Sequence, residues 1–532
     1  MRAFAALLDR LSTTPQRNVK LRLLRDYLAA TPDPDRGLAL AAITRDLEIP
    51  AVKPALLRAL AEERSDPVLF ALSYDYVGDL AETISLIWEA RPLADPPDLW
   101  LGAVVARLRA ASRSDAPALM AAYLDALDPP GRHALIKLAT GGLRIGAGAR
   151  LAKQALADFG GRDVTEIEEL WHALAPPYAA LFAWLEGRAE KPGAAALAPF
   201  RPVMLAHPLE AAELAALAPA DFAAEWKWDG IRVQATAEAG TRRLYSRSGE
   251  EVSAAFPDLM AALDFVGAID GELLVGRPGP QGLEPGTFSD LQQRLNRKTV
   301  SERLAESHPV FIRAYDILDD GAENLRPLPF MERRRRLAAF LARLDPARFD
   351  LSPLLPFANW DELARHRTHP PHPVIEGVML KRLDSPYLPG RPKGPWFKWK
   401  RDPFTVDAVL MYAQRGHGKR SSFYSDYTFG VWAADGTLVP VGKAYFGFSD
   451  EELKALDRYV RENTVERFGP VRAVRAEPGH GLVLEIAFEG LQRSGRHRSG
   501  LAMRFPRIAR LRWDKPPAEA DHLETLEALL PG

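Results

Sequence analysis

The stretch Glu225-Trp226-Lys227-Trp228-Asp229-Gly230-Ile231-Arg232 decides how the middle of this 532-residue chain folds. An aspartate followed by glycine indicates a tight turn. After the turn, Ile231, Val233 and Ala235 alternate with polar residues, which predicts a strand. The pattern therefore places Lys227 at a strand end or in a tight turn.

Lys227 is a candidate nucleophile. A lysine attacks only as the neutral amine, a form that burial or neighbouring cations favour. The Lys-x-Asp-Gly pattern alone is a weak signal, because a surface turn before a strand has the same letters. Trp226 and Trp228 are expected to pack in a core, and Asp229 fits either a functional carboxylate or a turn residue.

Further charged and aromatic residues follow Lys227 in a fixed order. They are Arg247 in the loop Ser246–Gly249, Glu272 at the head of a strand over 268–275, Tyr315 at the end of a strand over 310–318, Glu376, Lys398 and Lys400, and finally Arg512, Asp514 and Lys515. Lys398 and Lys400 are two residues apart, so they share one face of a strand.

This set of side chains fits nucleotidyl transfer. Cations neutralise a triphosphate and the leaving pyrophosphate. One or two carboxylates, together with phosphate oxygens, suit Mg²⁺. An aromatic ring can serve as a platform for the base.

The fold class expected is multidomain α+β. Residues 1–195 show apolar stripes at helical spacing, such as Leu7, Leu8 and Leu11, and predict an all-α domain. A Gly-, Pro- and Ala-rich linker covers 187–199. Residues 196–401 predict a mixed α/β nucleotidyltransferase domain, and 402–532 a small β-barrel such as an OB-fold. Other expected elements are a helix over 333–344, a hairpin around Asp435-Gly436, a helix over 450–463 and a strand over 482–488.

The composition of the chain limits the partners and the kinds of site that it can have. The net charge is −1, so a nucleic-acid binder must gather its Lys and Arg on one face. The chain has no cysteine, which excludes disulfides, thiolate metal sites and thiol nucleophiles. No apolar run approaches the roughly 20 residues of a membrane span. We therefore expect no membrane partner and a cytoplasmic location.

In order and spacing, these motifs resemble those of the ATP-dependent DNA ligases, over Glu225 to Lys515. The resemblance also reaches the first third of the chain. Gly141-Gly142-Leu143-Arg144-Ile145-Gly146, followed by a helical stretch over 151–157, is similar to the segment of the family's helical DNA-binding domain that meets the duplex backbone. The resemblance implies a bacterial-type ligase with a helical DNA-binding domain, an adenylation domain and an OB-fold domain.

The resemblance also assigns roles to positions. It implies that Lys227 forms a covalent lysyl–AMP and that Glu272 and Glu376 hold metal. The ATP- or AMP-binding residues would be Glu225 at adenine, Arg232 at the ribose or the nick terminus, Arg247 at phosphate, Glu272 at the ribose, Tyr315 stacked on adenine, Lys398 and Lys400 at the α-phosphate, and Arg512 and Lys515, with Asp514, at the pyrophosphate. Many relatives have Phe where this chain has Tyr315.

The implied cofactors are ATP as AMP donor and Mg²⁺, with Mn²⁺ as the alternative metal. The implied partner is nicked double-stranded DNA, encircled by a monomer. Arg144 and the basic loop 415–422, with Lys419 and Arg420, would contact the DNA backbone. The run Arg333–Arg336 is interpreted as one solvated helical turn outside the site.

Three other functions share parts of this pattern. An RNA ligase or RNA-capping guanylyltransferase has the lysine motif, but the helical first domain and the Arg512–Lys515 ending argue against it. A ligase that uses NAD would carry an extra nicotinamide-binding module and, usually, a cysteine zinc finger. The third alternative is a DNA-binding scaffold without activity, although every motif is intact.

Overall fold

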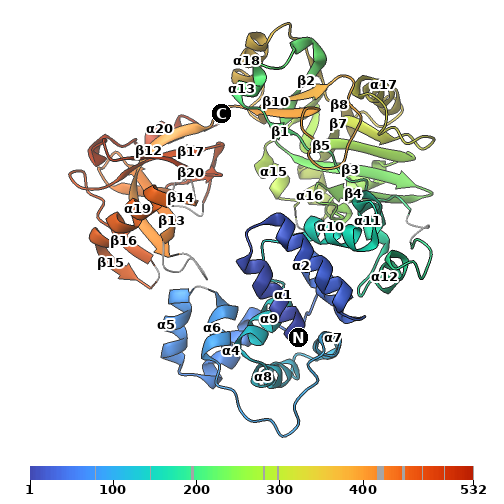
Figure 1. Ribbon diagram of the computed structural model, residues 1–532. Helices are drawn as coiled ribbons and strands as arrows, with labels where there is room; N and C mark the ends of the chain where they lie inside the picture. Colours follow the sequence, from blue (N-terminus) through green and yellow to red (C-terminus); the bar gives the residue numbers. More distant parts are fainter. Residues whose placement is uncertain are drawn as a thin grey trace. The chain divides into compact units, whose positions relative to one another are not determined.

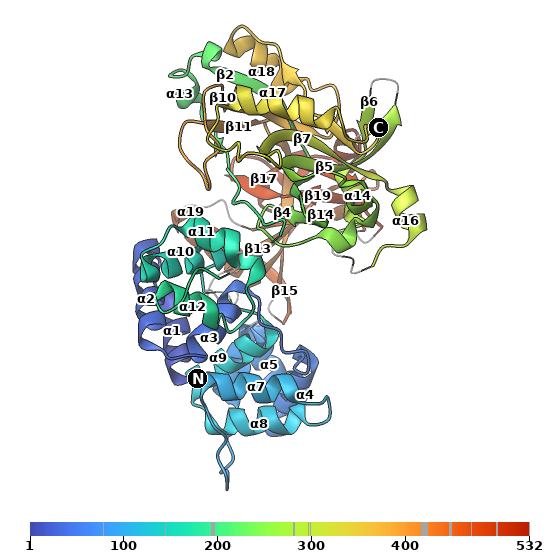
Figure 2. The same ribbon diagram turned by 90° about the vertical axis from the view of Figure 1, so that its right-hand side faces the viewer.

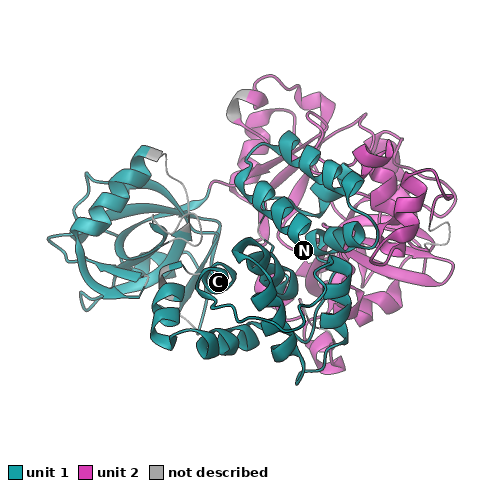
Figure 3. Ribbon diagram, turned by 60° about the horizontal axis from the view of Figure 1, so that its bottom comes forward, with its two compact units in different colours: residues 1–155, 403–532 teal, residues 156–402 magenta. Residues whose placement is uncertain are grey.

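The structure is a computed structural model that describes residues 1–77, 79–143, 145–192, 197–279, 282–295, 297, 299–415, 424–445, 450–469, 471–495 and 498–530. The chain forms two compact units (Figure 3). Unit 1 combines Met1–Ala155 with Pro403–Gly532, and unit 2 is Leu156–Asp402. Within the described residues, no helix is long and apolar enough to span a bilayer.

The first 192 residues, where described, form helices and no strand, as predicted. Leu7, Leu8 and Leu11 share one buried face of the first helix. The helices are α1 (Arg2–Thr13), α2 (Arg17–Ala30), α3 (Asp35–Thr44), α4 (Pro54–Arg64), α5 (Pro67–Val77), α6 (Leu80–Ile87), α7 (Leu101–Ala110), α8 (Ala116–Ala126), α9 (Pro129–Thr140), α10 (Ala149–Gly160), α11 (Val164–Leu170) and α12 (Ala179–Leu185). Helix α10 crosses from unit 1 into unit 2.

Unit 2 holds two sheets, seen together in Figure 2. The five-stranded sheet has the order β1 (His207–Pro208), β11 (Trp396–Lys400), β10 (Ile375–Arg382), β2 (Phe222–Trp228), β9 (Leu354–Leu355). The six-stranded sheet has the order β4 (Thr241–Ser246), β3 (Ile231–Glu238), β5 (Gly267–Gly279), β7 (Val310–Asp319), β8 (Phe349–Leu351), and β6 (Gly282–Pro285) pairs with β5.

The turn Asp229-Gly230 connects the two sheets, because β2 ends at Trp228 in one and β3 begins at Ile231 in the other. A side chain at Gly230 would place its Cβ 2.4 Å from the carbonyl oxygen of Leu273 on β5. Only glycine allows so close an approach between the turn and the neighbouring strand.

Two main apolar cores support the sheets of unit 2. Phe222, Ala224, Trp226 and Trp228 alternate along β2 into one core, which confirms that the two tryptophans pack. Val233, Ala235, Leu273 and Ile312 belong to a second core beneath the six-stranded sheet. The opposite face of β2, with Glu225 and Lys227, is left for polar groups.

Short helices cover unit 2. They are α13 (Ala211–Leu214), α14 (Pro257–Ala262), α15 (Phe288–Gln292), α16 (Glu302–Ser307), α17 (Phe330–Leu341) and α18 (Trp360–Thr368). Helix α17 lies along β7 and β8 (Figure 1). It begins three residues before the predicted helix over 333–344.

The C-terminal region is rich in strands, as predicted, and has its own apolar core. Its seven-stranded sheet contains β12 (Phe404–Arg415), β13 (Tyr424–Trp432), β14 (Leu438–Tyr445), β15 (Thr464–Phe468), β16 (Val471–Val474), β17 (Val483–Phe488) and β20 (Arg507–Arg512). The region also holds the pair β18 (Gly490–Arg493) and β19 (Leu501–Arg504), with helices α19 (Asp450–Glu462) and α20 (Leu523–Glu527). The predicted hairpin, helix and strand of this region are confirmed.

Candidate active site

Lys227 lies one residue before the end of β2, as predicted, on the face opposite the tryptophans. Its ammonium donates to the carboxylate of Glu376, the second residue of β10. The two strands pair with Gly377 opposite Lys227, and the register is irregular between Ile375 and Gly377. The irregularity places Glu376 beside the lysine.

Lys398 and Lys400 share one face of β11, as predicted, because they pair with Met379 and Gly377 of β10. The Nζ of Lys400 lies 3.9 Å from Oε2 of Glu376. Burial lowers the pKa of Lys398, and the nearby charges of Arg391 and Lys400 lower it further. These lysines therefore form a concentrated positive charge next to Glu376.

Glu272 faces this cluster from the other sheet. Burial raises the pKa of Glu272 to about 7, against the opposing effect of Lys227 and Arg232, and the charge of Glu376 adds to the rise. The prediction that Glu272 heads its strand is wrong. It is the sixth residue of β5, because the buried Asp270 before it continues the strand and does not start it.

Asp270 holds Arg232, a partnership that the sequence did not indicate. The guanidinium donates to Oδ2 of Asp270 at 2.6 Å, to the hydroxyl of Tyr387 at 2.9 Å and to the carbonyl oxygen of Met204 at 2.5 Å. Tyr387 also donates to Asp270. Arg232 is thus fixed by three partners at the edge of the cluster.

Tyr315 lies inside β7, so the prediction that it ends its strand is also wrong. The next residue, Asp316, is fully buried and pairs with Arg333, which lets the strand continue to Asp319. The Nζ of Lys381 lies 4.5 Å from the centroid of the Tyr315 ring. Burial raises the pKa of the Tyr315 hydroxyl well above its usual value, so the phenol stays neutral.

Glu225 is only 2% exposed and is held by two cations. Arg334 donates to Oε1 at 2.7 Å, and Lys381 lies 2.5 Å from Oε2. The interpretation of Arg333–Arg336 as a solvated turn is therefore wrong for its first half. Arg333 and Arg334 point inward from α17 to Asp316 and Glu225, whereas Arg335 remains 68% exposed.

Arg247 follows β4 in a turn, as predicted. Burial lowers its pKa, and the charges of Arg232 and Arg391 lower it further. Arg391, Lys381 and Arg334 were not predicted to belong to the site. The position of Lys381 could have been predicted from the sequence. Alternate residues of a strand share a face, so Gly377, Met379 and Lys381 lie on the same face as Lys227.

Arg512 and Lys515 meet at one carboxylate of unit 1. Arg512 donates to Oδ2 of Asp407 at 3.1 Å, and Lys515 donates to the same oxygen at 2.8 Å. Arg512 also binds Asp514. Asp407 on β12 therefore groups the three predicted residues of the closing motif.

Three family descriptions match the chain in order. They are "DNA ligase N terminus" over residues 1–157, "ATP dependent DNA ligase domain" over 203–400, and "ATP dependent DNA ligase C terminal region" over 420–515. A "Probable DNA ligase" of Streptomyces avermitilis is 33% identical over 527 residues, which cover 92% of this chain and 98% of that relative.

The chain belongs to the ATP-dependent DNA ligases.

Other ligases support the assignment along the whole chain. A "Probable DNA ligase" of Anaeromyxobacter sp. (strain K) is 34% identical, with 93% of this chain and 98% of the relative covered. One of Opitutus terrae is 32% identical over 99% of this chain, which spans 62% of that relative. A solved structure described as "Pmar-Lig_Pre." has a TM-score of 0.59 at 14% identity, covering 96% of this chain and 99% of that one, and is alike in fold alone.

Family membership confirms the predicted fold class and the predicted activity. The ligase has a helical N-terminal region, a mixed α/β adenylation domain and a C-terminal OB domain. It is an ATP-dependent DNA ligase, which argues against the guanylyltransferase, the NAD-dependent ligase and the inactive scaffold.

The N-terminal region of the ligase has a basic hollow of about 400 Å³, lined by Pro15, Arg17, Lys20, Gly146, Gly148, Arg150 and Leu151. Lys20 links the two chain segments that line the hollow, because its ammonium donates to the carbonyl oxygens of Ile145 and Gly146, each at 3.0 Å. The predicted DNA contacts Arg144, Lys419 and Arg420 lie outside the described residues.

Proposed function

We propose that this ligase seals nicks between a 5′-phosphate and a 3′-hydroxyl in duplex DNA, with Lys227 as the residue that carries AMP. The observation that carries the proposal is the position of Lys227. It lies on the polar face of β2, bonded to Glu376 and surrounded by Lys398, Lys400 and Glu272. Three lysines and two carboxylates at one spot fit a triphosphate and its counter-ion.

Three in-line displacements follow from this arrangement. Lys227 attacks the α-phosphorus of ATP, the N–P bond forms, and pyrophosphate leaves. An oxygen of the 5′-phosphate at the nick then attacks the phosphorus of the lysyl–AMP, the N–P bond breaks, and the Lys227 amine is released. Finally the 3′-hydroxyl attacks the activated 5′-phosphate and AMP leaves. Lys398 and Lys400 neutralise the α-phosphate in each step.

Glu272 and Glu376 are the carboxylates that would hold Mg²⁺, or Mn²⁺. Among the residues that the structure describes, no group of three or more His, Cys, Asp or Glu side chains could hold a metal ion. Two carboxylates facing each other across the cluster nevertheless fit Mg²⁺, which takes one or two carboxylates and completes its shell with phosphate oxygens and water. The ion would neutralise charge on the phosphates.

The other charged and aromatic side chains of the site would contact the remaining parts of ATP. Glu225 and Tyr315 contact the adenine, Arg232 the ribose or nick terminus, Arg247 phosphate, and Arg512 and Lys515 the pyrophosphate. We assign residues 1–195 to DNA binding, 196–401 to adenylation and 402–532 to the OB-fold domain. The hollow at Arg17 and Arg150, together with Arg144, Lys419 and Arg420, would bind backbone phosphates of nicked DNA encircled by one ligase molecule.

A sealing assay on nicked duplexes tests this function. Duplexes with DNA or RNA strands at the nick are incubated with ATP, GTP or NAD. We expect sealing of DNA nicks with ATP only, and labelling of the protein from α-labelled ATP. Labelling from GTP, or sealing with NAD in the absence of ATP, would contradict the proposal. Footprinting tests encirclement, which predicts protection on both sides of the nick.

A further inference from the structure

One buried ammonium, that of Lys381, connects the two side chains proposed to contact the adenine. Lys381 is 1% exposed and projects from β10 on the same face as Gly377 and Met379. Its Nζ lies 2.5 Å from Oε2 of Glu225 and donates to the carbonyl oxygen of Tyr315 at 3.1 Å. The same ammonium lies 4.5 Å from the centroid of the Tyr315 ring.

Arg334 holds the other oxygen of the Glu225 carboxylate. It donates to Oε1 at 2.7 Å, and its second amino group donates to the carbonyl oxygen of Ser352. With a cation on each oxygen, the carboxylate is held in one orientation. Each oxygen still has a second lone pair, so Glu225 remains able to accept a hydrogen bond.

Aromatic rings enclose Lys381 on its other sides. Its Nζ lies 4.6 Å from the Trp396 ring and 4.9 Å from the Phe330 ring. A buried charge pair contributes little to stability compared with well-packed apolar side chains. The retained charges therefore point to a role in orienting Glu225 and Tyr315.

The nucleobase that fits this arrangement donates a hydrogen bond. Adenine carries an amino group at C6, which a fixed carboxylate accepts from. Guanine and hypoxanthine carry a carbonyl oxygen at C6, which has no hydrogen to donate to the oxygens of Glu225. A site built around a buried polar partner discriminates strongly against an analogue that leaves the partner unpaired.

We propose that Lys381 and Arg334 are positioning residues that set the base specificity of the adenylation step, by fixing Glu225 as a hydrogen-bond acceptor beside the ring of Tyr315. The proposal rests on the proposed function in one respect, the contact of Glu225 and Tyr315 with the base. Lys381 and Arg334 contact Glu225, and Lys381 also contacts Tyr315. Their effect reaches the base through Glu225 and Tyr315.

The test compares ATP with inosine triphosphate, which has a carbonyl oxygen in place of the 6-amino group. Self-labelling of the full-length ligase is measured from each nucleotide, labelled at the α-phosphate, over a range of concentrations. For Lys381→Met and Arg334→Met we expect the KM for ATP to rise about tenfold or more, with a smaller change in the rate at saturation. The preference for ATP over inosine triphosphate should fall by a similar factor. Arg334→Lys should recover part of the preference.

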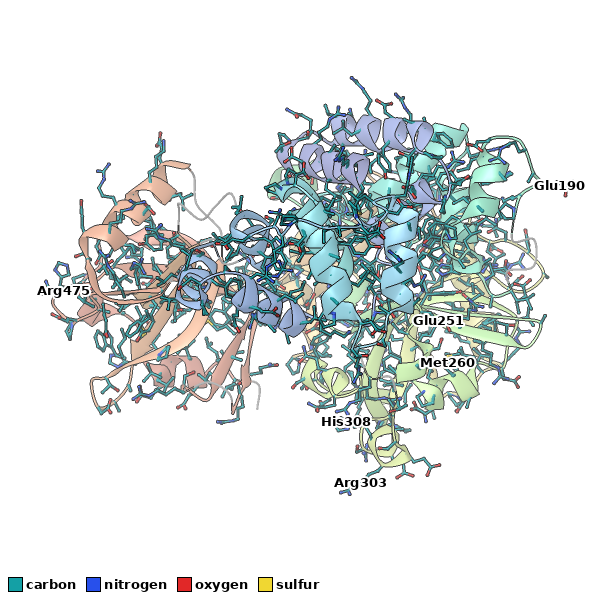
Figure 4. The ribbon with its side chains drawn as sticks, turned by 90° about the horizontal axis from the view of Figure 1, so that it is seen from below. Glu190, Glu251, Met260, Arg303, His308 and Arg475 are labelled. Atoms are coloured by element: carbon teal, nitrogen blue, oxygen red, sulfur yellow. The ribbon has the colours of Figure 1, made fainter. Side chains whose placement is uncertain are left out.

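Arg294→Met is the matched control. Arg294 is fully buried and pairs with Asp258 on α14, the helix on which Met260 is labelled in Figure 4. This substitution also removes a buried cation from a carboxylate. The cation that it removes does not contact Glu225 or Tyr315. It should lower the melting temperature and leave the nucleotide preference unchanged.

Two results would overturn the proposal. One is an unchanged preference in Lys381→Met and Arg334→Met, with only a loss of stability as in Arg294→Met. The other applies if Lys381→Met does not fold. It is a preference for ATP over inosine triphosphate that is the same in Arg334→Met, Arg334→Lys and the unmodified ligase. A failure of the proposed function looks different, because the unmodified ligase would then take no label at Lys227 from either nucleotide.

Discussion

Glu272 is a carboxylate of the site whose ionisation the fold disfavours. Its pKa rises from an ordinary 4.5 to about 7, chiefly because burial removes water from the carboxylate. The folded ligase therefore binds a proton there more tightly than the unfolded chain does. Ionisation of Glu272 therefore destabilises the folded ligase. This loss of stability is absent below pH 4.5, grows as the pH rises, and is complete above about pH 7.

Glu272→Gln should therefore stabilise the ligase at high pH. Without nucleotide or metal, we expect a gain on the order of 1–3 kcal/mol at pH 8.5 and little change at pH 5. Thermal melts at both pH values measure it. The control is Glu332→Gln, since hydrogen bonds from Arg335 and Arg336 lower the pKa of the exposed Glu332 to about 2. A gain for Glu272→Gln that is equal at both pH values would contradict this explanation.

The sequence identified the charged residues at the centre of the cluster, because motifs of this family carry them in a fixed order. It did not identify their partners. Arg232 pairs with Asp270 and Arg333 with Asp316, and Tyr387 donates a further hydrogen bond to Asp270. Without these partners an aspartate in a sequence suggests the end of a strand. Glu272 and Tyr315, which lie close to Asp270 and Asp316 in the sequence, were therefore predicted at strand ends.

Helix α17 combines two environments in four consecutive arginines. Arg333 is fully buried and binds Asp316 through two hydrogen bonds, at 2.8 and 3.0 Å. Arg335 points to solvent and binds Glu332 of its own helix. A helical turn presents successive residues in different directions, so a run of one residue type does not indicate a single environment.

Arg333→Met should thus destabilise the ligase strongly, by about 3–5 kcal/mol, because it removes the cation that is paired with the fully buried Asp316. Arg335→Met should change stability by less than about 0.5 kcal/mol. Chemical denaturation followed by the fluorescence of unit 2 tryptophans compares the two variants. Similar losses in both would show that α17 is not anchored by Arg333.

Strand β10 depends on Gly377, which separates Glu376 from the rest of the strand. Its φ is +147°, and a Cβ there would lie 2.3 Å from the carbonyl oxygen of Trp399 and 2.8 Å from the Cα of Lys400. An added methyl group must push β11, and with it Lys400, away from Lys227.

Gly377→Ala should reduce the rate of self-adenylation by about 100-fold, the order of loss expected from a shift of about 1 Å at a reacting centre. Gly240→Ala is the control, because Gly240 also has a positive φ, +81°, but has open space around it. Equal rates in the two variants would contradict the role given to the spacing of β10 and β11.

On the scale of the whole molecule, the order of regions could be predicted from the sequence. Helical periodicity before the linker and alternation after it are local patterns, and both are confirmed. The basic hollow could not be predicted, because it joins Arg17 on α2 to Gly146 and Gly148, about 130 residues later. With a net charge of −1, only such clustering provides a surface for DNA.

Arg17→Gln should weaken the binding of nicked DNA uniformly across sequences and reduce the slope of log K against log salt by about 1. Self-adenylation should be unchanged. Filter binding at several salt concentrations measures the slope, and Arg335→Gln serves as a control for the loss of an exposed positive charge. An unchanged slope for Arg17→Gln would show that the hollow is not part of the DNA interface.

The covalent role of Lys227 is tested most directly by self-adenylation with α-labelled ATP, followed by mapping of the labelled peptide. We predict that the label resides on Lys227 of the unmodified ligase. Lys227→Ala should take up no label and should seal no ordinary nick, yet should still join a nick supplied with AMP already attached to its 5′-phosphate. Label on another residue, or full sealing of ordinary nicks by Lys227→Ala, would contradict the account.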